Sequence, residues 1–264
     1  MTKFLRSRPG LVVYLTCGDP DLRSSLRIAL AAIEAGADVI ELGVPFSDPV
    51  ADGPIIQRAS ERSLARGTTL KHVLRLASEV RMQAPDAGLI IFSYLNPILR
   101  FGLKDFALAA RDSGADGALI TDLTVEEADD YISLMRAQDL DTVFLAAPTS
   151  TDARLKRIAA ASRGFIYAVS RTGITGTQQQ LAADAAALVK RMRRFTKLPI
   201  AVGFGISTPQ HFRSVGDFAD AAVIGSAIVQ LIERSVAAKH DPAAAVGDFI
   251  RQLKSSHHAV REQG

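Results

Sequence analysis

The sequence predicts an α/β protein in which eight parallel strands close into a single (β/α)8 barrel, the TIM barrel. Three observations favour this fold: β-rich runs alternate eight times with amphipathic helical patterns, the chain has 264 residues, and polar or glycine residues gather where the predicted strands end. Single barrels are typically about 250 residues long and collect functional groups at the carboxyl ends of their strands. An open doubly wound sheet is the alternative on pattern alone, but no GxGxxG sequence follows the first predicted strand.

The predicted strands are short runs rich in β-branched and other apolar residues. They cover residues 11–16, 38–44, 89–94, 117–122, 141–147, 165–170, 199–204 and 221–224. After the first strand, apolar residues at spacings of three and four predict a helix over 22–35, which Asp-Pro-Asp at 19–21 starts and Gly36 stops. Later helices are expected to open at 124–127, a capping-box pattern, and at the Ser-Thr-Pro of 207–209.

Composition favours one globular domain over residues 1–264, with the barrel at about 11–236 and a C-terminal helix and tail at 241–264. The chain is 48% hydrophobic and 22% charged, and no linker rich in Pro, Ser or Gly divides it. No run of 18 apolar residues predicts a membrane span, and the start lacks the apolar segment of a secretory signal. The single cysteine, Cys17, excludes an internal disulfide and fits a reducing cytosol, so we expect a cytoplasmic protein.

Basic residues cluster at 190–194 and at Lys197, although the formal net charge is only +3. Contact with nucleic acid is one interpretation of such a cluster. No aromatic residues interleave with these cations as a stacking platform would require, and cations are favoured near the end of a helix. The cluster is therefore expected to be the solvated face of a helix, and nucleic acid is not expected as a partner.

Two carboxylates are the strongest candidates for chemistry. Glu41 stands within the apolar strand 38–44, where an acid must be paired, neutral or functional, and Asp52 follows on a loop rich in Pro, Gly and Asp. One acid held by a strand and one on a loop suit proton transfer to and from one substrate. The structural alternative, in which Glu41 pairs with an arginine and Asp52 caps a helix, stays open on spacing alone.

The amino-acid sequence around these two carboxylates also resembles that of a known family. The run IELGVPFSDPVADGP at 40–54 resembles the signature of the tryptophan synthase alpha chain family, also known as indole-3-glycerol-phosphate lyases. The resemblance covers roughly residues 11–250. It continues, in the family's order, in YLTCGDP at 14–20, YLNP at 94–97, DLTVEE at 122–127, APTST at 147–151, SRTGITG at 170–176, GFGIS at 203–207 and IGSAI at 224–228.

The resemblance implies retro-aldol cleavage of indole-3-glycerol phosphate to indole and glyceraldehyde 3-phosphate, a step of tryptophan biosynthesis. It implies that Glu41 donates the proton to indole C3 and that Asp52 pairs with the indole N–H. It implies no metal and no organic cofactor on this chain. The expected partner is a beta chain, in an alpha-beta-beta-alpha heterotetramer whose pyridoxal phosphate belongs to the beta chain.

A phosphate site is predicted where two glycine-bearing turns follow the last two strands, because barrels frequently bind phosphate there with the N-terminus of an extra helix. The resemblance implies that Gly176, Gly205, Gly225 and Ser226 hold the phosphate. The polar segment 171–180 has the composition of a mobile lid, with an ordinary connector as the alternative. In the family this segment closes over the site, and its threonine, here Thr175, contacts the aspartate that corresponds to Asp52.

The wall of the indole pocket is predicted from apolar side chains on different strands. Aromatic residues in strands are more often plain core, and this alternative applies to each of them. Their alignment with the family's positions implies that they surround the indole ring, with phenolic groups that need polar partners. The predicted wall consists of Tyr14, Phe92, Tyr94, Leu119 and Tyr167.

The sequence also departs from the family's pattern. Only about ten residues precede the first strand, where the family has a longer amphipathic helix. Thr124 stands where the family usually has Pro, and Cys17 where a small or aliphatic residue is more usual. A free-standing lyase with the same chemistry, or a weakly active regulatory subunit, is therefore an alternative to the alpha subunit of a complex.

Overall fold

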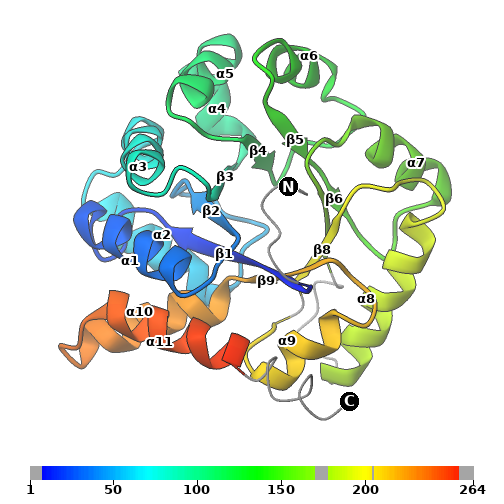
Figure 1. The fold of residues 1–264 in the computed structure, drawn as a ribbon. Helices are drawn as coiled ribbons and strands as arrows, with labels where there is room; N and C mark the ends of the chain where they lie inside the picture. The colour runs from blue at the N-terminus through cyan, green and yellow to red at the C-terminus, as the bar shows by residue number, and fades with distance from the viewer. Residues whose placement is uncertain (1–7, 170–177, 204, 256–264) are drawn as a thin grey trace.

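The structure is a computed structural model that describes residues 8–169, 178–203 and 205–255. Its described strands form one parallel sheet in the order β5-β4-β3-β2-β1-β9-β8-β7-β6. Since β5 and β6 are separated only by Phe144, they are two halves of one strand, and the sheet closes into an eight-stranded barrel surrounded by helices (Figure 1). The predicted (β/α)8 fold is confirmed.

The strands lie where the sequence predicted them, apart from the division of the fifth. Their bounds are β1 Gly10–Thr16, β2 Val39–Gly43, β3 Gly88–Ser93, β4 Gly117–Ile120, β5 Asp141–Val143, β6 Leu145–Ala146, β7 Ile166–Val169, β8 Ile200–Gly203 and β9 Ala221–Ile224. The helices are α1 Leu22–Glu34, α2 Pro54–Ala65, α3 Leu70–Gln83, α4 Leu95–Phe101, α5 Leu103–Asp112, α6 Asp129–Ala137, α7 Asp152–Ala161, α8 Gln178–Met192, α9 Pro209–Val215, α10 Ser226–Ala237 and α11 Pro242–Ser255.

Two of the three predicted helix starts are correct. The side chain of Asp21 accepts a hydrogen bond from the backbone N–H of Ser24 and caps α1, and Thr208 caps α9 in the same way. The expected start at 124–127 is wrong, because those residues close a separate turn in which the N–H of Glu127 donates to the carbonyl of Thr124. The helix α6 begins later, at Asp129, and its two acidic residues in the first turn complement the helix dipole.

The core has an inner and an outer layer. Alternate residues of the strands point into the barrel, where large and small apolar side chains fill its interior. This inner cluster consists of Val12, Val39, Ile90, Leu119, Val143, Phe165, Ala201, Ala221 and Val223. The other face of each strand packs against the helices in a larger cluster that includes the fully buried Phe106 and Phe212. The barrel interior is therefore a packed core, and the cavity described below lies where the strands end.

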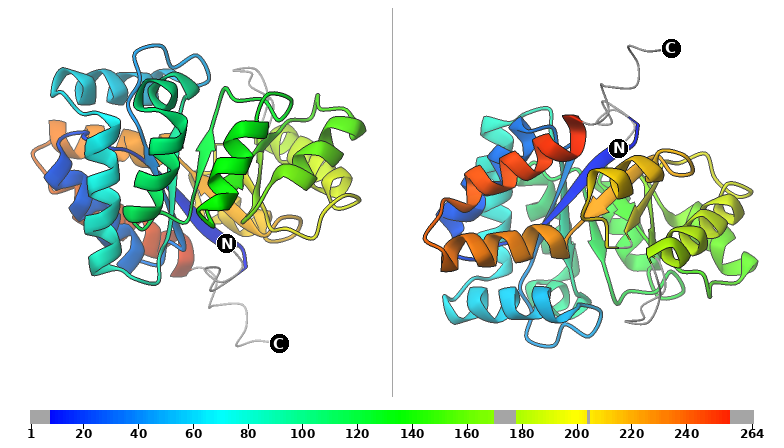
Figure 2. Two further views of the ribbon diagram at one scale, coloured as in Figure 1. Left: turned by 90° about the horizontal axis from the view of Figure 1, so that it is seen from above. Right: turned by 90° about the horizontal axis from the view of Figure 1, so that it is seen from below.

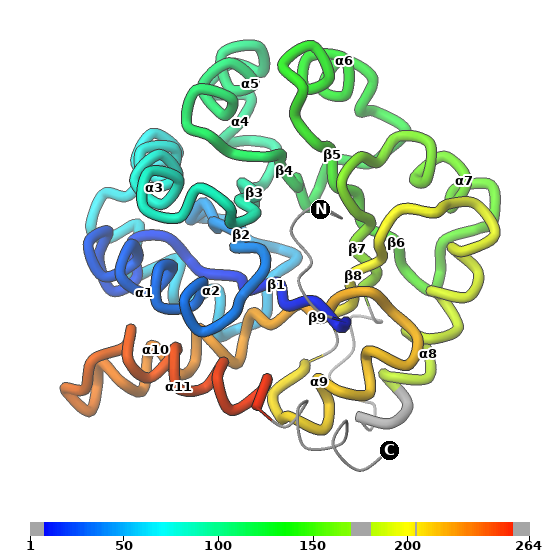
Figure 3. Tube along the Cα trace, viewed as in Figure 1, coloured from blue at the N-terminus to red at the C-terminus, as the bar shows by residue number. Residues whose placement is uncertain are grey.

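Two helices add to the usual arrangement at the carboxyl end of the barrel. The helix α2 follows the loop after β2, and α10 begins two residues after β9. Figure 2 shows α2 and α10 side by side, and Figure 3 shows how the chain after β9 turns directly into α10. The two helices pack on each other and on β1, so this side of the barrel has an extra layer next to the strand ends. Among the described residues, no helix is long and apolar enough to cross a membrane.

Candidate active site

A cavity of about 480 Å³ opens at the carboxyl end of the barrel. Strands β1, β2, β3, β7 and β9 contribute Tyr14, Glu41, Phe92, Tyr167 and Val223 to its lining, and the loops and helices around them complete it. Such a volume matches the clefts that hold small organic ligands. Most of the predicted site residues within the described part of the chain therefore meet in one place.

Glu41 is held at the floor of this cavity by β2, between Tyr14 of β1 and Ile90 of β3. Its side chain is 0% exposed, and neither carboxylate oxygen has a hydrogen-bond partner among the described residues. Burial therefore raises the pKa of Glu41 from 4.5 to about 8. Among the described residues no arginine pairs with Glu41, contrary to the structural alternative. Near neutral pH the residue is a carboxylic acid with a proton to give.

Asp52 faces the same cavity from the loop between β2 and α2. Its Oδ2 accepts a hydrogen bond from the Tyr94 hydroxyl at 3.1 Å, and that hydroxyl in turn accepts one from the N–H of Ala51 at 3.0 Å. Burial raises the pKa of Asp52 to about 6, although the hydrogen bond from Tyr94 lowers it. Asp52 does not cap α2, because the capping position is Gly53. With a pKa of about 6, Asp52 is mostly ionised at pH 7.

The apolar wall is built mainly by Tyr14 and Phe92, whose rings meet edge to face with centroids 5.0 Å apart. Two glycines make room for the phenolic groups. A Cβ added at Gly43 would lie 2.4 Å from the Tyr14 hydroxyl, and one added at Gly203 would lie 2.6 Å from the Tyr167 hydroxyl. A larger residue at either position would displace a wall tyrosine, so these glycines shape the cavity from the neighbouring strand.

Two residues of the predicted wall occupy other positions. Leu119 is fully buried in the inner barrel cluster beside Phe92 and Tyr167 and is not among the described residues that line the cavity. Tyr94 is the residue before the first turn of α4, and its hydroxyl contacts Asp52 and Ala51. Its contact with the second carboxylate is a role that strand pattern did not predict.

The part of the cavity lining that follows β8 and β9 has the features of an anion site. Gly225 precedes the first turn of α10 and caps it without a side-chain hydrogen bond, and Ser226 lies at the start of that turn. Gly205, with a φ of +76°, lines the cavity beside Ile206 and Ser207. Uncapped N–H groups at a helix N-terminus attract anions. Among the described residues that line the cavity there is no Lys or Arg, so backbone dipoles would supply most of the attraction.

Comparisons with known proteins show the family of this chain. The profile of the tryptophan synthase alpha chain family matches residues 2–258. The chain is 50% identical to the tryptophan synthase alpha chain of Solibacter usitatus over 229 residues, 87% of this chain and 85% of that protein. It is 46% identical to the protein of the same name from Laribacter hongkongensis, with 93% of each chain covered.

The chain belongs to the tryptophan synthase alpha chain family. Members of this family are lyases that cleave indole-3-glycerol phosphate. Two solved structures extend the likeness to the fold. The alpha subunit from Legionella pneumophila superposes with a TM-score of 0.87 at 35% identity over 95% of this chain and 93% of that one. A chain from the tryptophan synthase a2b2 complex of Pyrococcus furiosus gives a TM-score of 0.85 at 36% identity, with 94% and 98% covered.

Several residues that the sequence analysis did not predict also line the cavity of this tryptophan synthase alpha chain family member. Ile55 and Ile56 of α2, Thr121 after β4, Leu145 of β6 and Gln230 of α10 all line it. Gln230 lies four residues after Ser226 on the same helix face, which is a signal that helical periodicity could have supplied. Thr175 and Gly176 of the predicted lid and phosphate site lie outside the described residues.

Proposed function

We propose that this chain cleaves indole-3-glycerol phosphate to indole and glyceraldehyde 3-phosphate, with Glu41 and Asp52 as its proton-transfer groups. One observation carries the proposal: a buried carboxylic acid that has no hydrogen-bond partner among the described residues lines a cavity of substrate size, and a second carboxylate with a lower pKa lines the same cavity. Family membership supplies the identity of the substrate. The two pKa values, about 8 and about 6, separate the acid from the base.

In the proposed reaction Glu41 gives its proton to C3 of the indole ring, and Asp52 takes the proton of the ring nitrogen. The protonated C3 then becomes a good leaving carbon. When its bond to the glycerol carbon breaks, the electron pair of that bond returns to the ring and the nitrogen regains its proton from Asp52. The glycerol hydroxyl becomes the aldehyde and returns a proton to the Glu41 carboxylate, so both groups finish as they began.

The phosphate end of the substrate would lie at Gly225 and Ser226, with Gly205 from the neighbouring loop. The helix α10 has no acidic residue in its first turn, which leaves its positive dipole end unopposed. The indole ring would lie between the two carboxylates, against Tyr14 and Phe92. The resemblance also implies substrate-binding roles that remain predictions, and these concern Tyr94, Leu119, Tyr167, Thr175 and Gly176.

We also propose that the chain works with a beta chain, in an alpha-beta-beta-alpha heterotetramer of cytoplasmic tryptophan biosynthesis. The similar structure from Pyrococcus furiosus is of an a2b2 complex. Two large apolar side chains, Val50 at 85% and Leu99 at 56% exposure, follow β2 and β3 at the carboxyl end of the barrel, where a partner could cover them. The cleavage needs only proton transfers, so no cofactor is expected here, and pyridoxal phosphate would belong to the beta chain.

The experiment that tests this function is the release of indole from indole-3-glycerol phosphate by the purified chain, with and without increasing amounts of its cognate beta chain. Indole release that rises with the beta chain supports the alpha subunit of a complex. Equal, fast release in both conditions favours the free-standing lyase. No release in either condition would refute the proposed cleavage.

A further inference from the structure

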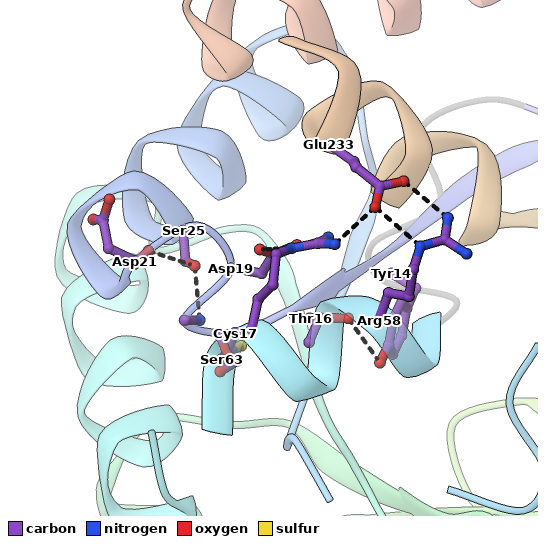
Figure 4. Close-up of polar contacts among 11 residues, drawn as sticks. Tyr14, Thr16, Cys17, Asp19, Asp21, Ser25, Arg58, Ser63 and Glu233 are labelled. Carbon is purple, nitrogen blue, oxygen red and sulfur yellow. Dashed lines mark hydrogen bonds and ion pairs between the residues drawn. The ribbon is translucent and has the colours of Figure 1, made fainter. Parts of the chain in front are cut away.

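A chain of ion pairs outside the cavity joins three segments at the carboxyl end of the barrel. Glu233 of α10 receives hydrogen bonds from Arg58 and Arg62 of α2, and Arg62 also donates to Asp19 in the loop after β1. Figure 4 shows Glu233 between the Arg58 side chain and Asp19. We call these four residues the Glu233 network.

The network has well-formed geometry. The Arg62 guanidinium forks onto the Asp19 carboxylate at 2.9 and 2.8 Å and reaches Glu233 at 2.7 Å. Arg58 forks onto Glu233 at 3.1 and 3.0 Å. Arg58 and Arg62 are four residues apart, so they share one face of α2 and converge on one acid. Glu233 is therefore the residue that links α10 to α2 in this network.

The second half of α2 is fixed to the loop after β1 by further contacts. The Ser63 hydroxyl donates to the carbonyl of Cys17 at 2.6 Å. Gly18 packs so closely that a Cβ there would lie 2.4 Å from the Ser63 hydroxyl oxygen and 2.1 Å from that of Thr68. This half of α2 is an anchor tied to the first strand. Glu233 attaches α10 to that anchor.

The opposite ends of the same helices line the cavity. The helix α2 begins at Pro54, two residues after Asp52, and α10 begins at Ser226 in the anion site. The helices also touch through small apolar side chains, Ala59 of α2, which lies between Arg58 and Arg62, and Val229 of α10, which lies between Ser226 and Glu233. Apolar contacts of this kind are not directional, whereas the charged hydrogen bonds of Glu233 have a defined geometry that restricts the angle between the helices.

We propose that Glu233 is a positioning residue that sets the distance between the Asp52 loop and the phosphate end of the cavity. This inference rests on the proposed function, in which one substrate must reach both ends at once. A shift of about 1 Å in such an arrangement can cost up to 100-fold in rate. The ion pairs that Glu233 makes are exposed or part-buried at the surface, and such pairs contribute little to stability, so we expect a variant without Glu233 to fold with a changed geometry.

The test compares a ligand that spans both ends with a ligand that occupies one. Indole-3-propanol phosphate carries the ring and the phosphate, whereas glycerol 3-phosphate carries the phosphate alone. In Glu233→Gln we expect the dissociation constant of the spanning ligand, measured by calorimetry, to rise about tenfold and that of glycerol 3-phosphate to change less than about twofold. The kcat/KM for cleavage should fall with the spanning ligand's affinity.

The matched control is Arg27→Gln, which breaks the exposed pair between Arg27 and Asp241 and touches no described residue of the cavity. This control should bind both ligands as the parent does. The proposal would be overturned if Glu233→Gln bound the spanning ligand as tightly as the parent does. It would also be overturned if Glu233→Gln bound both ligands more weakly by the same factor, or if Arg27→Gln lost as much affinity for the spanning ligand. If the parent itself binds neither ligand, the proposed function fails. Should Glu233→Gln not fold, Arg58→Gln removes two of the three hydrogen bonds that Glu233 accepts and must show a selective loss in the same direction.

Discussion

The two carboxylates of the cavity are eleven residues apart in the sequence, and they differ in the element that carries them, in burial and in hydrogen bonding. Glu41 is fixed by a strand, fully buried and without a hydrogen-bond partner among the described residues. Asp52 is carried by a loop and receives a hydrogen bond from Tyr94. Burial raises the pKa of both, to about 8 and about 6. The difference shows how one cavity can hold a proton donor and a charged acceptor at the same pH.

The strand and the loop also differ in what fixes the side chain. Strand pairing on both sides prevents Glu41 from turning toward solvent. Asp52 depends on contacts with segments distant in sequence, because Tyr94 lies directly after β3 and α2 is tied to α10. Changes distant in sequence should therefore affect Asp52 and leave Glu41 as it is.

The largest expected effect comes from Glu41→Gln, which removes the proton donor and keeps the side chain nearly isosteric. General acid–base groups contribute about 10²–10⁴-fold to rates, and indole release should fall by an amount in this range. A steady-state assay on variant and parent with matching circular dichroism spectra measures the loss. Release at more than about a tenth of the parent rate would remove Glu41 from the mechanism.

Glu41 should also make the stability of the chain depend on pH. Because its folded-state pKa of about 8 lies above the ordinary 4.5, the native state keeps the proton longer than the unfolded chain. Its contribution is complete below the ordinary pKa and is lost as the pH rises through about 8. The free energy of unfolding of Glu41→Gln minus that of the parent should therefore grow from pH 5 to pH 9, by on the order of a few kcal/mol. Urea unfolding at several pH values measures this difference, and a difference independent of pH would contradict the raised pKa.

A change at the other end of the cavity separates binding from proton transfer. A Cβ at Gly225 would lie 3.5 Å from that of Tyr14, an ordinary contact, so a side chain fits there without collision. Gly225→Asp places a negative charge at the start of α10, and KM for indole-3-glycerol phosphate should rise about tenfold or more. The neutral Gly225→Asn is the matched control and should raise KM less. Equal KM values for both variants and the parent would place the phosphate elsewhere.

The barrel could be predicted from the sequence because its strands and helices are marked by patterns within short segments. Apolar runs mark the strands, and polar residues at their ends mark the carboxyl face, so Glu41, Asp52 and Gly225 could be found without coordinates. The contacts that tune these residues are not local. The hydroxyl of Tyr94 meets Asp52 across 42 residues of sequence, and Arg62 meets Glu233 across 171. No periodicity predicts such pairs. The missed start of α6 has a similar cause, because the capping-box pattern at 124–127 closes a turn of its own.

The smallest effect, and the most selective, is expected from Tyr94→Phe. The parent kcat/KM should fall below about pH 6, where Asp52 gains a proton, and above about pH 8, where Glu41 loses one. The Tyr94 hydroxyl stabilises the charged form of Asp52, so its removal raises the pKa of that carboxyl. The acid side of the profile should then move to higher pH while the alkaline side stays in place, with a loss of roughly threefold at the optimum.

The matched control for this last change is Tyr131→Phe, which removes a buried hydroxyl that donates to the carbonyl of Ala118 at 3.0 Å outside the cavity lining. It should leave both sides of the profile where they are in the parent. Profiles of kcat/KM from pH 5 to pH 9 for the three proteins provide the measurement. An unmoved acid side in Tyr94→Phe, or an alkaline side that moves with it, would mean that the two carboxylates are not tuned independently. The two sides of the pH profile should move independently because Glu41 is held by a strand and Asp52 by a loop with its own hydrogen bond from Tyr94.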